Sequence, residues 1–596
     1  MKLHIDFRGN RKIALPDSAD TERRKLSPPI PQGRIHLSHQ LHEPLHMMFV
    51  EDLSEDFINH ISGEHILLFV NYDVDAVCAC RILQNLFRSE STLYTLVPVE
   101  GTQELVEAYK RFSDKVKYVV FINCGGSIDL VETLEPEPDV LMFVIDSHKP
   151  SDICNVYSRS QVRLLGKPDE SENIPQFEDI FLDTDTEPES EEEEVNEEAL
   201  KKRRERKLWE EKRNRVMFDY TQFSFCGRAS SLVVFELIWN LGKDDLESLW
   251  WAIVGLTYQT VMGLIVEQKY ACELQVLQLH LSRLTSISQN DVEANRSQFY
   301  RITAQKDLRL VLYRHWNVQA SLRHTICSAL KLKLWTVRSE KRLYQVLAEI
   351  GLPLKDSLQN FSSMDVTLRN EFFSMVETIA NNHDLDELIY HSFTVSVCYG
   401  NNFFQASDYV YAMICLLEDT MKDKSRGSCF SNCIDSLSPT KYNLVLNGIE
   451  KCKKLFTSIV RLVQSMLDMK QIISAGPFLY FIINENTSDY SLYAHPMSLA
   501  MLARYALNAC ASQSNYRKHG SLPLIVSAPQ SEENCIVLGI PPVTEYVPRN
   551  FFGKAFDQAL ETINTEPILS YFDSAAVRIS IKDRPKFFDS LSTILS

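Results

Sequence analysis

The chain has 596 residues, of which 45% are hydrophobic and 24% are charged, an ordinary globular composition that predicts two to four domains at this length. It contains no run of 18 apolar residues, and its N-terminus lacks an apolar segment followed by a small-residue cleavage site, so neither a transmembrane helix nor a secretory signal is expected. The net charge is −17, but residues 169–200 hold fifteen acidic and no basic residues. The remainder is close to neutral, which argues against a protein that grips duplex DNA by bulk charge.

The 14 cysteines are scattered and form no CxxC pair. The closest approach to one is Cys429 with Cys433, which has no second half, so no zinc site is expected. Free cysteines with apolar neighbours fit a reducing compartment, the cytosol or the nucleus.

Residues 1–47 hold five prolines and five histidines and show neither helical nor alternating periodicity. We expect this N-terminal extension to be disordered and dispensable. The histidines alone do not make a metal site, because nothing in the pattern would hold them together.

Short apolar runs rich in β-branched and aromatic residues begin at Ile66, and amphipathic helical stretches lie between them. Continuous apolar strands that alternate with helices predict a parallel sheet covered on both faces, with its ligands beyond the carboxyl ends of the strands. The expected strands are Ile66–Val70, Leu93–Val99, Tyr118–Ile122 and Val140–Ile145.

An insertion in this domain, residues 168–216, is first acidic and then basic. Residues 169–200 are too acidic to bury a core and are expected to be disordered, with Ser190 before four glutamates as a candidate site for an acid-directed kinase. Residues 201–215 (KKRRERKLWEEKRNR) favour a solvated helix. The basic run is either a nuclear import signal or only a charged helix face, and the sequence does not decide between them.

Residues 230–390 are mostly helical in pattern, and Leu246–Ile265 is apolar nearly all round, so it should be buried. After about Phe393 we expect a loop near 419–439, a long helix over 441–470, and then a second α/β domain. Its expected strands are Phe478–Ile483, Leu524–Ser527, Ile536–Ile540 and Val577–Ile581, and its expected helices are 497–511, 551–563 and 584–595. The expected divisions of the chain are 1–47, 48–265, 266–390 and 391–596.

Polar residues follow three of the N-terminal strands, where a ligand should lie. The first strand is followed by Asn71-Tyr72-Asp73-Val74-Asp75, the third by Asn123-Cys124-Gly125-Gly126, and the fourth by Asp146-Ser147-His148-Lys149-Pro150. Carboxylates and an imidazole that converge at strand ends are typical of a divalent-metal site. Each alone is weak evidence, because an Asp after a strand is often only a helix N-cap.

The order of these motifs resembles the DHH phosphoesterase superfamily, which includes the RecJ exonuclease. There, an Asp-x-Asp, a second acidic position, an Asp-His-His and a later Gly with a nearby Asp hold two manganese ions for phosphodiester hydrolysis. The resemblance implies a parallel-sheet DHH domain, a helical intermediate domain and a C-terminal DHH-associated α/β domain.

The resemblance is closer to the eukaryotic RecJ-like branch and runs from about Met48 to Ser596. It is carried by Leu249–Leu256, Asp307–Trp316, Leu334–Leu343, Gly351–Lys355, Gly476–Tyr480 and Asn550–Phe556, and by the acidic insertion followed by a basic helix. It implies a nuclear subunit of the replicative DNA helicase whose partners are the MCM ring and the GINS complex, acting in initiation and elongation of DNA replication.

The metal-ligand positions indicate that this member is not an enzyme. Asp73, Asp75, Asp146 and His148 are retained, but Asn123 stands at the acidic position and Ser147 at the first histidine position, and Tyr258 lies about where the last Asp is expected. We therefore expect a non-catalytic scaffold with no cofactor and no bound metal. The alternative is an active manganese-dependent exonuclease or phosphoesterase.

A third hypothesis is a single-stranded nucleic-acid binder, which requires aromatic residues interleaved with basic ones. Arg549, Phe551, Phe552 and Lys554 fit this pattern and are candidate contacts. The simpler interpretation of the same residues, which we favour, is the start of an amphipathic helix.

Overall fold

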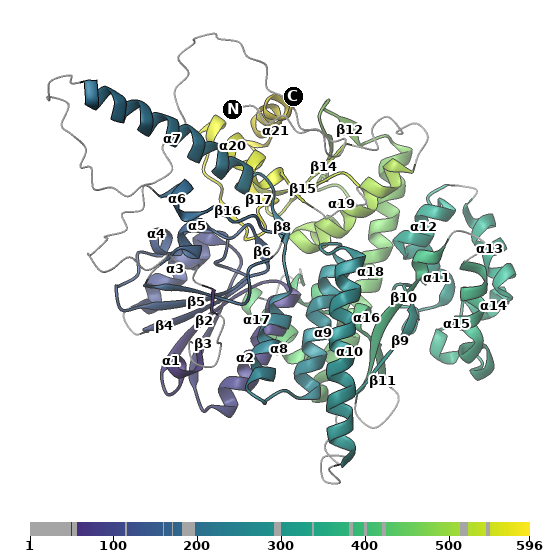
Figure 1. The fold of residues 1–596 in the computed structure, drawn as a ribbon. Helices are drawn as coiled ribbons and strands as arrows, with labels where there is room; N and C mark the ends of the chain where they lie inside the picture. Colours follow the sequence, from purple (N-terminus) through teal and green to yellow (C-terminus); the bar gives the residue numbers. More distant parts are fainter. Residues whose placement is uncertain are drawn as a thin grey trace.

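The computed structural model describes residues 49–50, 57–113, 116–158, 160–169, 171–181, 197–290, 300–336, 339–380, 385–397, 402–419, 425–512, 522–543 and 549–596. It is a mixed α/β structure in which an N-terminal sheet and a C-terminal sheet lie next to each other, with a large helical region beside both (Figure 1). The expected extension, residues 1–47, and the core of the acidic stretch, residues 182–196, lie outside the described residues. Within the described ranges, no helix is both long enough and apolar enough to cross a bilayer.

A six-stranded parallel sheet forms the N-terminal part, in the order β1-β7-β5-β4-β2-β3. All four apolar runs that predicted strands are strands, and β2 pairs in parallel with both β3 and β4. The sequence analysis did not identify β1 and β7, the two strands at the edge of the sheet opposite β3. The strands are β1 (Phe49–Val50), β2 (His65–Asn71), β3 (Leu93–Val99), β4 (Tyr118–Ile122), β5 (Leu141–Ile145) and β7 (Val162–Leu165).

Helices cover both faces of this sheet, as its continuous apolar strands require. Alternate residues of β2 enter two different cores: Ile66, Leu68 and Val70 in one and Leu67 and Phe69 in the other. The first core contains α2 (Val74–Ser89), α8 (Ser230–Asn240) and α9 (Leu246–Val261), and the second contains α3 (Thr102–Phe112), α4 (Leu130–Leu134) and α5 (Ile153–Val156).

The helix α9 is buried on all sides, as predicted, although it ends at Val261 rather than Ile265. It packs against α2 and α8 on the side of the N-terminal sheet and against α16 (Ala406–Leu417) on the other side. Trp250 meets the ring of Tyr409 in α16, and the Trp251 indole donates to the carbonyl of Leu437. One continuous core therefore joins the N-terminal sheet to elements more than 150 residues later in the chain.

The first part of the acidic stretch is structured, so the prediction of disorder from residue 169 onward was wrong there. Glu172 is buried, pairs with Lys149 at 3.2 Å and accepts hydrogen bonds from the Ser151 amide and the Tyr220 hydroxyl. The helix α6 (Phe177–Ile180) belongs to the same region, and its Phe177 ring packs on Tyr157. Interspersed aromatic residues and one paired carboxylate are enough to order this segment despite its charge.

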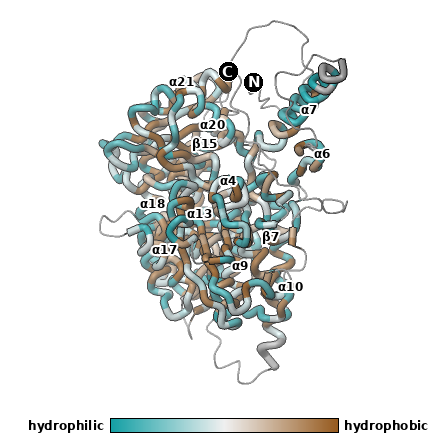
Figure 2. The backbone as a smooth tube through the Cα atoms, turned by 90° about the vertical axis from the view of Figure 1, so that its left-hand side faces the viewer, coloured by the Kyte–Doolittle hydropathy of each residue, from teal (hydrophilic) through white to brown (hydrophobic). Residues whose placement is uncertain are grey.

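The basic run forms the predicted helix, α7 (Glu197–Thr221), which extends away from the body of the molecule (Figure 1). Figure 2 colours it mostly hydrophilic, whereas hydrophobic segments gather in the body. Its base is held by an ion pair between Lys212 and Asp179 at 2.6 Å.

The middle of the chain contains a three-stranded antiparallel sheet that the helical pattern did not reveal. β9 (Tyr300–Leu308) pairs along its whole length with β10 (Ile389–Val397), which also pairs with β11 (Asn402–Gln405). This pairing crosses position 390, where the sequence suggested a boundary. The helices of this region are α10 (Glu267–Asn290), α11 (Val318–His324), α12 (Ile326–Leu332), α13 (Ser339–Ile350), α14 (Leu354–Ser357) and α15 (Val366–Ala380).

The loop expected near 419–439 is in fact largely a helix, α17 (Arg426–Ser436). Ser425 caps its N-terminus, and Cys429 and Cys433 lie one turn apart on its buried face. Serines and a glycine hid this apolar face in the sequence. The long helix α18 (Tyr442–Asp468) follows, as predicted.

The C-terminal sheet has six strands in the order β12-β13-β14-β15-β17-β16 and is antiparallel except for β13 with β14. All four predicted strands and all three predicted helices are present. The strands are β12 (Ile473–Ser474), β13 (Leu479–Ile482), β14 (Leu524–Pro529), β15 (Asn534–Ile540), β16 (Leu569–Ser570) and β17 (Ala576–Ser580), and the helices are α19 (Pro496–Ala511), α20 (Phe552–Ile563) and α21 (Arg584–Leu595).

Candidate functional site

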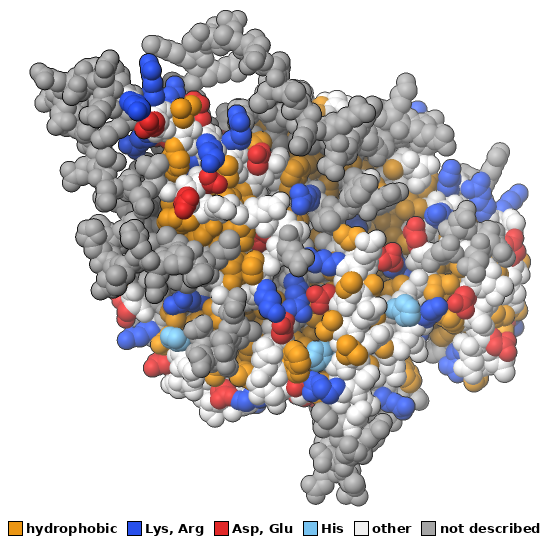
Figure 3. Space-filling model, viewed as in Figure 1, with side chains coloured by type: hydrophobic (Ala, Val, Ile, Leu, Met, Phe, Trp, Pro, Cys, Tyr) orange, Lys and Arg blue, Asp and Glu red, His pale blue; other side chains and the backbone are white. Residues whose placement is uncertain are grey.

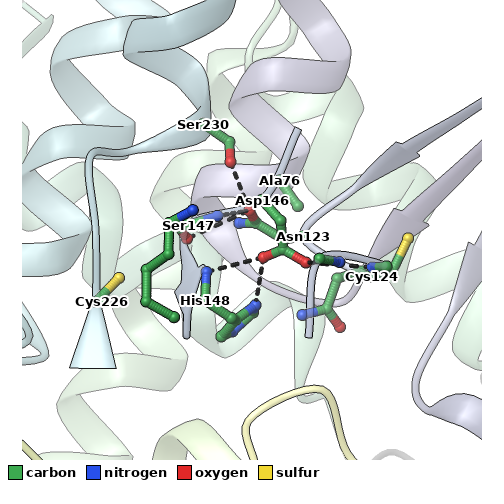
Figure 4. Close-up of polar contacts among 12 residues, drawn as sticks. Ala76, Asn123, Cys124, Asp146, Ser147, His148, Cys226 and Ser230 are labelled. Atoms are coloured by element: carbon green, nitrogen blue, oxygen red, sulfur yellow. Dashed lines mark hydrogen bonds and ion pairs between the residues drawn. The ribbon is translucent and has the colours of Figure 1, made fainter. Parts of the chain in front are cut away.

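The residues predicted from the strand ends come together at the carboxyl edge of the N-terminal sheet. Figure 4 shows Asn123, Asp146, Ser147, His148 and Ser230 converging on one another from separate segments of the chain. Asp73, Asp75, Asn123 and Ser147 are all less than 10% exposed. The site is therefore a buried polar cluster inside an otherwise apolar sheet edge.

Asp73 is the N-cap of α2, whereas Asp75, the residue that could have been only a helix cap, lies in the first turn of that helix. Asp73 Oδ1 accepts from the Ala76 amide at 2.7 Å, and its Oδ2 accepts from the Asn71 side chain at 2.9 Å. Both oxygens also accept from the Asn123 side-chain amide, at 3.2 Å each.

The side-chain carboxylate of Asp75 lies at the N-terminus of α8, whose backbone amides donate hydrogen bonds to it. The amides of Ser230 and Ser231 donate to its two oxygens at 2.7 and 3.0 Å, and the Ser231 hydroxyl donates at 2.6 Å. Free N–H groups and the positive end of the helix dipole favour a negative charge at this place. The sequence analysis missed both serines, although two hydroxyl residues before an apolar run are a helix-start signal.

Asn123 connects the carboxylates to the rest of the site. Its side-chain nitrogen lies between Asp73 and Asp75, 3.4 Å from Asp75 Oδ2. Its side-chain oxygen accepts from the Ser147 amide at 3.0 Å and from the Ser230 hydroxyl at 2.5 Å. The residue has φ = +53°, a left-handed conformation that Asn and Asp adopt more easily than other non-glycine residues.

Asp146 and His148 form an ion pair with 2.8 Å between Oδ1 and Nδ1. The backbone amide of His148 donates to the same oxygen, and those of Gly125 and Gly126 donate to Oδ2 at 3.2 and 2.7 Å. Gly126 allows this approach, because a Cβ there would lie 2.6 Å from the Cβ of Asp146.

The charges in the cluster alter the acidities of its members. Burial and the neighbouring Asp75 raise the pKa of Asp73 to about 7, and burial raises the pKa of Asp75. Burial alone would lower the pKa of His148, but the Asp146 carboxylate outweighs it and raises that pKa to about 9. Burial opposes ionisation of Asp146, yet its bonds and charge interaction with His148 leave its pKa below the usual value. His148 is therefore the cluster's own cation at neutral pH.

These residues, as arranged, do not fit two manganese ions. Each of the six carboxylate oxygens of Asp73, Asp75 and Asp146 already accepts at least two hydrogen bonds from N–H or O–H groups. A divalent ion would have to displace these donors, since metal ligation needs the same lone pairs. Within the described ranges, these residues and His148 do not bring three ligand atoms within 4.8 Å of one another.

Tyr258 lies on α9 beside this cluster and lines a cleft that adjoins it. Burial raises the pKa of its phenol, and nearby Asp73 adds to the effect, which disfavours the phenolate form that metal ligation would require. Gly255, one turn earlier, lies against the cluster, because a Cβ there would stand 2.7 Å from Asp75 Oδ1.

A cleft of about 1160 Å³ separates this cluster from the C-terminal domain. A two-stranded ribbon, β6 (His148–Lys149) with β8 (Phe225–Cys226), forms part of its wall. The lining includes eight acidic side chains but only five Lys or Arg, so the cleft as a whole is not basic. Figure 3 likewise shows acidic, basic and apolar side chains mixed on the visible face, with no broad single-sign field.

Two of the candidate nucleic-acid contacts, Arg549 and Lys554, line this cleft. Arg549 stacks on the ring of Phe225 at 5.7 Å. Phe552 is fully buried and packs against Phe551 with 4.5 Å between ring centroids. The Phe552 ring is thus part of the core and is not exposed to stack on a base.

Comparison with known proteins identifies relatives over nearly the whole chain. The CDC45 family model matches residues 66–205 and 183–594. The cell division control protein 45 homolog of Homo sapiens is 38% identical over 568 residues, which cover 92% of this chain and 100% of the human protein.

One solved structure shares the fold of this chain. The crystal structure of CDC45 from Entamoeba histolytica matches with a TM-score of 0.67 and 21% identity, covering 92% of this chain and 100% of the other. The crystal structure of RecJ in complex with Mn²⁺ from Thermus thermophilus has a TM-score of 0.39 and 11% identity, covering 93% of this chain and 56% of the other.

Proposed function

Because this chain belongs to the CDC45 family, we propose that it acts in DNA replication as a non-catalytic scaffold subunit of the replicative helicase, which links the MCM ring to the GINS complex. Family membership confirms the resemblance predicted from the sequence. We further propose that it acts in both initiation and elongation of DNA replication.

The observation that carries the non-catalytic part of the proposal is the Asn123 amide between Asp73 and Asp75. A two-metal hydrolase clamps the attacking and leaving oxygens with two cations, which need unoccupied carboxylate oxygens. Here protein N–H and O–H groups occupy those oxygens, so the cluster is stable as a hydrogen-bonded network without an ion.

A nuclease assay tests this directly. The full chain is incubated with labelled single-stranded DNA and millimolar Mn²⁺, beside an Asp73→Ala/Asp146→Ala variant. We expect no release of nucleotides above the rate of that variant. Release by the parent alone would establish the alternative, an active manganese-dependent exonuclease.

The partner assignment needs a separate experiment. The tagged chain should retain MCM and GINS subunits through purification from replicating cells, at a stoichiometry near one to one. Recovery of the chain only as a free monomer would refute the scaffold role while leaving the family assignment intact.

The proposal includes a contact with single-stranded DNA through Arg549 and Lys554. Fluorescence anisotropy with a labelled oligonucleotide should show weaker binding by an Arg549→Ala/Lys554→Ala variant and a smaller dependence of affinity on salt. Lys586→Ala, an exposed position on α21, is the matched control. Equal affinity of all three proteins would remove single-stranded DNA from the proposal.

We place the protein in the nucleus, with Lys201–Lys207 as the import signal. Charge reversal of the basic residues in this run should reduce nuclear accumulation of a fluorescent fusion, because import receptors recognise clustered positive charge. Unchanged accumulation would leave only a charged helix face.

A further inference from the structure

The three-stranded sheet in the middle of the chain ends in a long edge strand, β9, which is paired on one side. β9 spans nine residues, Tyr300–Leu308, and among the described strands its partner is β10. Apart from β10, it packs chiefly against α9. The four consecutive residues 303–306 are all exposed, so both faces of the middle of this strand are open to solvent.

The register with β10 shows which backbone groups of β9 face outward. The Arg309 amide donates to the Leu388 carbonyl, so this pair and every second pair before it exchange hydrogen bonds between the two strands. The residues between those pairs direct their N–H and C=O groups away from β10. In the exposed part of the strand they are Ile302, Ala304 and Lys306.

Within the described ranges, the backbone groups of these three residues have no hydrogen-bond partner. The next outward amide, that of Leu308, donates to the Asp307 side chain at 2.8 Å, which closes this end of the edge. A row of unpaired N–H and C=O groups on an edge strand can pair with the backbone of another extended segment. The open part of the edge is therefore centred on Ala304.

The other edges of the described sheets are protected from such pairing. β1, β12 and β16 are two residues long and β11 is four residues long, which leaves little backbone for a partner strand. β3, at one edge of the N-terminal sheet, contains Pro98, which has no N–H to donate. β9 is longer than all of these strands and contains no proline.

The charges along the open edge are positive. Arg301 and Lys306 are exposed on β9, and His391, which lies opposite Lys306 on β10, is exposed as well. The one carboxylate of β9, Asp307, is buried and pairs with Arg314 at 2.8 Å. An added strand with acidic side chains would meet opposite charges, whereas a basic strand or a second copy of β9 would meet like charges.

We propose that the free edge of β9 is a docking site for an extended acidic segment of a partner protein, which adds as a further strand beside β9. The outward backbone groups around Ala304 would supply affinity that depends little on sequence, and Arg301 and Lys306 would select acidic segments. The β9 residues do not line the cleft described above, and the docking site does not depend on the partners proposed there.

A defined peptide tests the proposal on the full chain. The probe is a fluorescent peptide of alternating threonine and glutamate, equal in length to β9, and the matched control alternates threonine and lysine. Threonine favours extended backbone in both peptides, so they differ in the sign of their charge. We expect saturable binding of the Thr-Glu peptide by fluorescence anisotropy and at least about tenfold weaker binding of the Thr-Lys peptide. Hydrogen exchange of residues 300–308 should slow when the Thr-Glu peptide is bound.

A pair of variants at one position locates the binding. Ala304→Pro removes an outward N–H without breaking a bond to β10, and Ala304→Val keeps that N–H. We expect Ala304→Pro to weaken binding of the Thr-Glu peptide about tenfold and Ala304→Val to bind it like the parent. If Ala304→Pro does not fold, Arg301→Glu/Lys306→Glu takes its place and should bind the Thr-Lys peptide more tightly than the Thr-Glu peptide.

Several results would overturn the proposal. They are the absence of saturable binding, equal binding of the two peptides, equal affinities of Ala304→Pro and Ala304→Val, and unchanged hydrogen exchange of residues 300–308. Sedimentation velocity of the chain without peptide examines the other occupant, a second copy. A dimer that Ala304→Pro dissociates would show that β9 pairs with itself, and this too would refute the acidic partner.

Discussion

Asn123 can be converted to the acidic residue that a metal site would need, and the structure gives the size of the effect. In Asn123→Asp a carboxylate oxygen replaces a nitrogen that lies 3.2 Å from both oxygens of Asp73 and 3.4 Å from Asp75 Oδ2. Two unit charges at this separation repel by about 5 kcal/mol at an effective dielectric constant of about 20. Uptake of a proton relieves part of this, so we expect the free energy of unfolding to fall by about 3–5 kcal/mol at pH 7.5.

The loss should depend on pH, with a sign that follows from the added carboxyl group. Its pKa is raised in the folded protein, so the folded state binds more protons than the unfolded state above pH 4. The destabilisation is therefore small at pH 5 and increases toward pH 8. Asn123→Gly is the control, since it suits the positive φ and removes the same hydrogen bonds without adding charge. Its loss should increase less steeply with pH than that of Asn123→Asp, because it removes hydrogen bonds to Asp73 and Asp75 but adds no charge.

Urea denaturation at pH 5 and pH 7.5, with and without millimolar Mn²⁺, is the assay. Manganese should restore stability to Asn123→Asp at pH 7.5 but not to Asn123→Gly or the parent, because only the added fourth carboxylate creates a need for a cation. If Asn123→Asp were as stable as the parent at pH 7.5 without metal, the role assigned to the Asn123 amide would be refuted.

Three further predictions concern the same cluster, and a fourth concerns the N-terminus. Because the pKa of Asp73 is raised to about 7, its ionisation lowers the free energy of unfolding as the pH rises from about 4 to 7. Asp73→Asn should therefore flatten this part of a plot of unfolding free energy against pH, and an unchanged slope would contradict the prediction. Because the pKa of His148 is raised to about 9, its ion pair stabilises the fold fully below about pH 6.5, and this stabilisation is lost as the pH rises through 9. The melting temperature of the parent should therefore decline between pH 7 and 9, and His148→Gln should remove this decline. Gly255→Ala should lower the free energy of unfolding by about 1–3 kcal/mol, because its Cβ collides with Ser231 and Asp75. Gly427→Ala in helix α17, whose Cβ meets nothing within 4 Å, should leave the free energy of unfolding unchanged or raise it by up to about 1 kcal/mol. Deleting residues 1–47 should leave the melting temperature and partner binding unchanged, and a drop of several degrees would show that they pack on the core.

Local sequence patterns predicted the centre of the N-terminal sheet well, because β2, β4 and β5 are buried on both faces and are therefore uniformly apolar. The run Ile66–Val70 needs no knowledge of its neighbours to be identified as a strand. β9 and β10 are different, because β9 is an edge strand whose exposed residues include the polar Gln305 and Lys306, so it shows no uniform apolar run. Its partner is about 80 residues away, so only the tertiary structure reveals the pairing.

The sequence predicted the residues of the site but not the hydrogen-bond partners of their polar groups. The positions after each strand identified Asp73, Asp75, Asn123 and Asp146, since parallel strands end at one edge. That Asp75 is held by the first amides of α8 was not predictable, because it depends on backbone geometry 155 residues later. Similarly, Glu172 is one acidic residue among many in the sequence, and its burial and its contacts with Lys149, Ser151 and Tyr220 distinguish it only in the structure.

The all-round burial of α9 has a consequence for how this protein is made. On the ribosome, α9 emerges together with the N-terminal sheet, but α16, which covers its other side, follows only after about 150 more residues, roughly 10–30 s of synthesis at ordinary elongation rates. During that interval one side of α9 is an exposed apolar surface on the nascent chain, because Trp250 is not yet packed on Tyr409. A chaperone that binds apolar segments should therefore associate with nascent chains stalled between residues 300 and 400 and dissociate once α16 has emerged. Fragments that stop at residue 265 should aggregate for the same reason.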